Sequence, residues 1–156
     1  MRTRLAGICF SAWSIPAARE PLERSRDANP TDPDTLLMLG YFYALIGLNE
    51  QAAHLFTELL AIDPLTPISH CMPGFVALME GRNSDALPHY RKFFKMDPYN
   101  SFAAWSCGYA LLRNGRVEEA SEVIGELKVN HPDSVMTQFS HALLSRVRGR
   151  HNLIIY

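Results

Sequence analysis

The residues best suited to bind a metal are His70, Cys71 and Cys107. Imidazole and thiolate groups ligate zinc, but a structural zinc site normally needs four well-placed ligands. His70 and Cys107 fall at positions expected to face inward, so we expect core packing, no metal and no cofactor. A metal- or haem-binding module is the alternative for this cluster. The three cysteines include no close pair, which argues against a disulfide framework and fits a reducing, cytoplasmic location.

Known catalytic motifs are absent from the sequence. It contains no glycine-rich phosphate loop, no HExxH and no nucleophile elbow, so we expect no catalytic residue and no enzyme activity. The 15 basic residues nearly balance 16 acidic ones, which leaves no net field to attract nucleic acid or a membrane surface. No apolar run approaches the roughly 20 residues that span a bilayer. We therefore expect neither nucleic acid nor membrane among the partners.

A period of 34 residues runs through the chain. It relates one set of prolines and two sets of glycines: Pro30, Pro64, Pro98 and Pro132; Gly47, Gly81, Gly115 and Gly149; Gly40, Gly74 and Gly108. The same step relates four helix-capping residues, Asp32, Thr66, Asn100 and Ser134. Glycine ends a helix in a left-handed conformation, and proline stops the following one. The period therefore predicts helix pairs joined by short turns, with the second glycine set facing small alanines of the partner helix.

This pattern resembles the tetratricopeptide repeat (TPR) family, whose helix–turn–helix unit has the same length. The closest copy of the family pattern is Leu36, Leu39, Gly40, Tyr43, Ala52, Phe56 and Pro64. The resemblance implies an all-α fold, a right-handed superhelical solenoid of antiparallel helix pairs with about three full repeats and partial repeats at both ends. The expected parts of this single domain are a degenerate repeat at 1–32, repeats at 33–66, 67–100 and 101–134, a C-terminal helix at 135–149 and a tail at 150–156.

Two features depart from a regular array. Pro73 stands inside an expected helix, where proline removes a hydrogen bond and typically kinks the helix, so we expect a bend between 67 and 80. Gly149 falls where the next helix break belongs. The last four residues, 153–156, form an apolar stub, which suggests that the chain continues in a longer protein or contacts another copy.

One face of the first helix of each repeat is apolar although packing within the repeat does not require it. The resemblance implies that these positions line a concave groove. A solvated helix face should be polar, and a continuous apolar surface usually marks a binding site. The predicted groove residues are Leu37, Tyr41, Ile68, Phe75, Met79, Phe102, Trp105, Tyr109, Arg113 and Phe139. Cys71 occupies the same repeat position as Leu37 and Trp105.

We therefore expect a protein–protein interaction scaffold that binds a partner peptide or helix in this aromatic groove. The expected anchors are Trp105, Tyr109 and Phe75. Three arginines are placed to meet acidic residues at one end of the ligand: Arg113, Arg146 and Arg148.

Other interpretations of the same face stay open. The chain would serve as a regulatory TPR segment of a larger kinase or cyclase, or as a self-association module that forms a homodimer. Alternatively, neighbouring helices or the tail at 151–156 cover the face, and it is part of the core.

Overall fold

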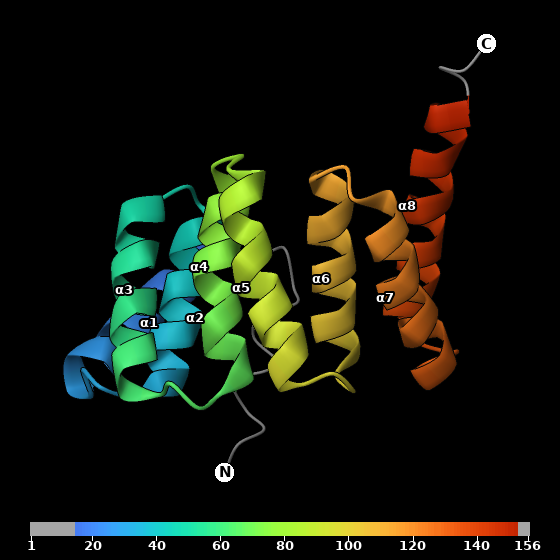
Figure 1. Ribbon diagram of the computed structural model, residues 1–156. Helices are drawn as coiled ribbons and strands as arrows, with labels where there is room; N and C mark the ends of the chain where they lie inside the picture. The colour runs from blue at the N-terminus through green and yellow to red at the C-terminus, as the bar shows by residue number, and fades with distance from the viewer. Residues whose placement is uncertain (1–14, 153–156) are drawn as a thin grey trace. The chain divides into compact units, whose positions relative to one another are not determined.

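The computed structural model describes residues 15–152, with side chains described from Arg19 to Gly149. Within this part of the chain every regular element is an α-helix (Figure 1). The helices are α1 (Ile15–Ala28), α2 (Pro33–Leu45), α3 (Asn49–Ile62), α4 (Pro67–Met79), α5 (Asn83–Met96), α6 (Ser101–Arg113), α7 (Val117–Asn130) and α8 (Val135–Asn152).

The described helices form two compact units, separated in the sequence between Leu65 and Thr66. In the first unit, α2 packs against α1 and α3. In the second unit, α4 packs against α5, α5 against α6, and α6, α7 and α8 pack against one another. Each unit is therefore an all-α stack of helical repeats, as the 34-residue period predicts.

The turns between paired helices are built on the glycines of the repeat. Gly47, Gly81 and Gly115 have positive φ angles of 82°, 77° and 72°. In each turn the next residue donates its N–H to a carbonyl five residues back, as Leu48 does to Tyr43 over 2.8 Å. The glycine donates to the carbonyl three residues back, which completes a Schellman motif. The expected left-handed helix ends are confirmed.

Replacing Gly115 by alanine is expected to destabilise the second unit by about 1 kcal/mol, because a Cβ disfavours a left-handed φ. Gly125→Ala is the matched control, since Gly125 lies exposed inside α7 with open space around its Cβ position. There alanine should stabilise by about 0.5–1 kcal/mol through its higher helix propensity. Urea unfolding followed by circular dichroism measures both changes. Effects of equal sign would contradict the turn geometry.

The glycines inside the first helices make close contacts, but not mainly with the expected alanines. A Cβ on Gly40 would lie 2.5 Å from Cε1 of Phe56, and one on Gly108 would lie 3.1 Å from Cγ1 of Ile124. Both large side chains are buried. A long side chain on the second helix reaches over the space left by the missing Cβ, so glycine accommodates a large neighbour.

Two local expectations concern Pro73 and Gly149. α4 forms one helix with Pro73 inside it, and the bend expected there stays a prediction. The expected helix break at Gly149 is wrong, because α8 continues through this residue to Asn152. A glycine permits a helix end but does not impose one, since the residues after it must also leave the helix. Expectations on 1–14 and 153–156 lie outside the described residues. No described helix combines the length and hydrophobicity needed to cross a bilayer.

Candidate functional site

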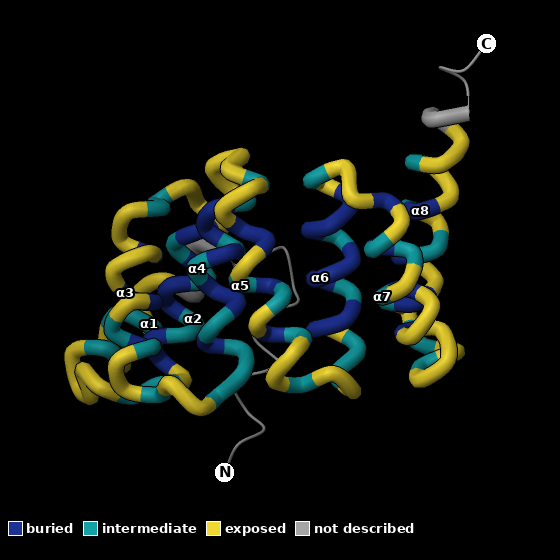
Figure 2. Tube along the Cα trace, in the orientation of Figure 1, coloured by how far each residue is buried: buried dark blue, intermediate teal, exposed yellow. Residues whose placement is uncertain are grey.

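α6 has two sides of different character. Phe102, Trp105, Tyr109 and Arg113 follow at intervals of three or four residues, so they form one stripe along the helix. Phe102 and Arg113 are exposed, whereas Trp105 and Tyr109 are partly buried. In Figure 2 most of α6 is coloured as buried or intermediate. The buried residues of the helix are Ala103, Ala104, Ser106, Cys107, Gly108, Ala110, Leu111 and Leu112.

The three rings of the stripe stack on one another. The ring centroids of Phe102 and Trp105 are 5.5 Å apart with planes inclined by 28°, and those of Trp105 and Tyr109 are 5.9 Å apart at 16°. Arg113 continues the stack, with its guanidinium carbon 6.0 Å from the Tyr109 ring centroid and Nη1 3.5 Å from the hydroxyl. Aromatic pairs contribute about 0.5–1.5 kcal/mol beyond area burial, so these contacts hold the rings in a defined arrangement.

Two other helices support the stack. Phe93 of α5 is only 1% exposed, and its ring lies 6.0 Å from that of Phe102 at 59°. Phe139 of α8 is 55% exposed, and its ring lies 6.4 Å from that of Trp105 at 58°. The stack therefore rests on the core at Phe93 and extends onto α8 at Phe139. We call the surface formed by Phe102, Trp105, Tyr109, Arg113 and Phe139 the aromatic face.

The centre of the aromatic face holds an unsatisfied donor. The indole Nε1 of Trp105 is buried and has no hydrogen-bond partner among the described residues. A buried donor without an acceptor costs about 1–3 kcal/mol, and tryptophan usually finds a partner when buried. The stack therefore holds this donor away from every acceptor that the structure describes.

The other predicted groove residues lie on different helices. Leu37 and Tyr41 are partly buried on α2, in the first unit. Ile68 and Phe75 are partly buried on α4, and Met79 is exposed at the end of that helix. Contacts between rings, and between Arg113 and Tyr109, join five of the predicted residues into the aromatic face. The role of all ten residues in binding stays a prediction.

The structure buries one residue of the predicted face and adds a residue that supports this face. Cys71, which shares the repeat position of Leu37 and Trp105 but is not one of the ten predicted groove residues, is 1% exposed; α4 buries more of its circumference than one stripe. Phe93, which supports Phe102, was not predicted. Its repeat position holds Leu59 and Leu127, also buried, and this recurrence of large apolar residues is the signal that identifies it.

The residues considered for metal binding do not assemble a site. Within residues 15–152, no three His, Cys, Asp or Glu side chains are placed to hold one ion. Both described cysteines are buried free thiols. Burial raises the pKa of Cys71 to about 12 and that of Cys107 to about 11, because a thiolate is poorly solvated there. These thiols are part of the packing.

In a Cys9→Ser variant, the two buried thiols should react with iodoacetamide at pH 8 at least about 100-fold more slowly than in urea-unfolded protein, because the thiolate is the reactive form. Because burial disfavours the thiolate, the stability linked to the two raised pKa values is fully present below pH 9, where the thiols stay protonated in the folded and the unfolded protein. This stability is lost as the pH rises toward 11 and 12, because the unfolded protein then ionises its thiols more readily than the folded protein does. Mass spectrometry of quenched samples measures the labelling. Rapid labelling of the folded protein would contradict the burial.

Comparison with known proteins supports the repeat assignment. Residues 76–135 match the family model for the tetratricopeptide repeat. A thermophilic TPR protein of Thermus thermophilus is similar with a TM-score of 0.77 and 19% identity, over 87% of this chain and 75% of that one. MamA from Desulfovibrio magneticus is similar with a TM-score of 0.65 and 18% identity, over 90% and 87%. The first TPR domain of Spaghetti, bound to an HSP90 peptide, has a TM-score of 0.65 and 15% identity, over 75% and 93%.

No curated protein matches the sequence. The fold is nevertheless that of tetratricopeptide repeat proteins, and the segment that matches the family model includes α5, α6 and α7. The expected all-α repeat fold and the resemblance to this family are therefore confirmed. The stack on α6 and its support at Phe93 lie inside the matched segment.

Proposed function

We propose that this protein is an interaction module whose aromatic face binds a helical segment of a partner protein. The observation that carries the proposal is the row of stacked, partly exposed rings at Phe102, Trp105 and Tyr109. Rings already held in place lose little conformational freedom on binding, so more of the contact energy contributes to affinity.

The chemistry of the aromatic face also favours binding. Tryptophan, tyrosine and arginine are the residues most enriched among those that dominate interface energies. The face contains no nucleophile and no acid–base pair, so it is suited to binding rather than catalysis. A protein of the same fold, the Spaghetti domain, is known with a peptide bound.

A displayed library of helical peptides, selected on the immobilised wild-type protein, tests the proposal. We expect peptides with apolar or aromatic residues at i, i+3, i+4 and i+7. They should fail to bind a Trp105→Ala/Tyr109→Ala variant. They should bind Tyr99→Ala normally, because this ring is 76% exposed and lies outside the aromatic face. Peptides that bind all three proteins equally would place the site elsewhere.

Self-association is a distinct outcome of the same variants. Light scattering over a range of concentrations shows whether the wild-type protein dimerises. A dimer that Trp105→Ala/Tyr109→Ala abolishes would make a second copy of this chain the occupant of the aromatic face. In that case the partner is a second copy of this chain and not a different protein.

A further inference from the structure

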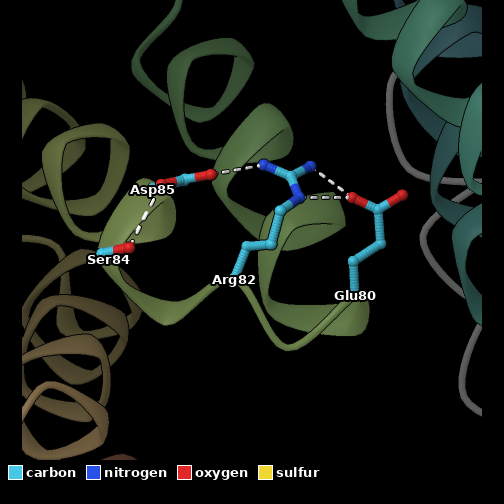
Figure 3. Close-up of polar contacts among 4 residues, drawn as sticks. All are labelled: Glu80, Arg82, Ser84 and Asp85. Atoms are coloured by element: carbon cyan, nitrogen blue, oxygen red, sulfur yellow. Dashed lines mark hydrogen bonds and ion pairs between the residues drawn. The ribbon is translucent and has the colours of Figure 1, made fainter.

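Most described arginines already have a carboxylate partner. Arg82 is an example, with its guanidinium between Glu80 and Asp85, 2.8 Å from the Asp85 Oδ2 (Figure 3). The others with such partners are Arg19, Arg24, Arg26, Arg91 and Arg116. Among the side chains that the structure describes, the arginines without an ion pair are Arg113, Arg146 and Arg148.

These three arginines lie toward the C-terminal ends of α6 and α8. The two helices pack together and run in the same direction, so these ends lie on the same side of the unit (Figure 1). Arg113 ends the ring stack of α6. Arg146 follows Phe139 at i+7, which places it on the same stripe of α8. Arg148 instead donates to the Ser121 Oγ of α7 over 2.8 Å.

The charges of the two helices have one sign only. Neither α6 nor α8 contains an aspartate or a glutamate, and both Arg113 and Arg146 are exposed. The described lysines, Lys92, Lys95 and Lys128, lie on α5 and α7. The surface that carries the aromatic face therefore ends in two exposed guanidinium groups that form no ion pair with a described carboxylate.

We infer that the partner segment is an acidic amphipathic helix: its apolar side chains lie on the rings, and its Asp or Glu side chains pair with Arg113 and Arg146. This rests on the proposed function of the aromatic face. Guanidinium groups bind carboxylates through paired hydrogen bonds. Fixed charges at one end of an apolar surface set the direction in which a ligand lies and exclude segments with basic residues there.

A role in helix stability makes a different prediction. A cation near a helix C-terminus stabilises the helix through the backbone dipole. If this is the only role, replacing Arg113 and Arg146 by glutamine lowers the melting temperature and leaves ligand choice unchanged. If Arg113 and Arg146 bind an acidic partner, the same variant changes ligand choice, and this change does not depend on stability.

The peptides selected on the wild-type protein provide the test. We expect Asp and Glu to be enriched at one end of the apolar stripe. In the best peptide, replacing these acids by glutamine should weaken binding about tenfold in low salt, as for two partly exposed ion pairs. The same change should have no effect on binding to Arg113→Gln/Arg146→Gln. Arg82→Gln is the control, because it removes a charge at an arginine that already has partners.

The outcomes separate the inference from the proposed function. Peptides that need Trp105 and Tyr109 but show no acidic enrichment would overturn the acidic partner and leave the binding face intact. If no selected peptide depends on Trp105 and Tyr109, the proposed function itself fails. Tighter binding of a single-stranded oligonucleotide than of any peptide, lost in Arg113→Gln/Arg146→Gln, would also overturn the inference, because it would make nucleic acid the ligand.

Discussion

Peptides selected on the wild-type protein are expected to bind the Trp105→Ala/Tyr109→Ala variant at least about 100-fold more weakly. Each ring is partly exposed and lies at the centre of the stack. Truncation of one such anchor typically costs about 2 kcal/mol or more. The two effects are not strictly additive, because each ring also holds the other in place. Isothermal titration of the selected peptides measures the loss.

The control for this variant is the helical fold itself. The far-ultraviolet circular dichroism should not change, because the buried residues through which α6 packs against its neighbours lie off the stripe. If the double variant unfolds, Phe139→Ala takes its place, since this ring is more than half exposed and still contacts Trp105. Full affinity in a folded double variant would remove the aromatic face from consideration.

Phe93→Ala is expected to destabilise the second unit by about 3–5 kcal/mol. The side chain is almost completely buried, and its ring supports Phe102 at the base of the stack. Removing the ring leaves a cavity and takes away this support. Urea denaturation should show a lower transition midpoint with an unchanged slope. Below the transition, peptide binding should also weaken, because Phe102 loses its fixed position.

Phe139→Ala is the matched comparison, because it is the same chemical change at an exposed ring. Its expected cost in stability is about 1 kcal/mol or less, while it removes one contact surface from the aromatic face. The two substitutions should therefore separate, with Phe93 acting mainly on unfolding and Phe139 mainly on binding. A large loss of stability in Phe139→Ala would show that this ring belongs to the core.

The repeat fold could be predicted from the sequence because its signals are local. A proline, a helix cap and a left-handed glycine each fix a few backbone angles, and the constant spacing repeats these local signals along the chain. Gly115 is one example, and its turn has the expected geometry. Gly149 shows the limit of this reasoning. The same residue type at the same step lies inside α8, because the surrounding residues decide whether a helix ends.

The aromatic face could be predicted only in part. Helical spacing alone places Phe102, Trp105 and Tyr109 on one stripe. The stacking angles and the approach of Phe139 depend on rotamers and on how α8 packs against α6, which the spacing does not determine. The same limit applies to Cys71, whose helical spacing predicts a place on the groove face but whose side chain is buried. Ion pairs also depend on tertiary contacts, so only the structure shows that Arg113 has no ion pair with a described carboxylate.

The most direct test of the central claim is the nuclear magnetic resonance signal of the Trp105 indole N–H. The sequence contains two tryptophans, so a Trp13→Phe variant labelled with nitrogen-15 gives one indole signal, from Trp105. If the aromatic face binds the partner helix, titration with a selected peptide should shift this signal in proportion to the bound fraction. An unchanged signal at saturation would contradict the claim, since a ligand lying on these rings cannot leave the indole in the same environment.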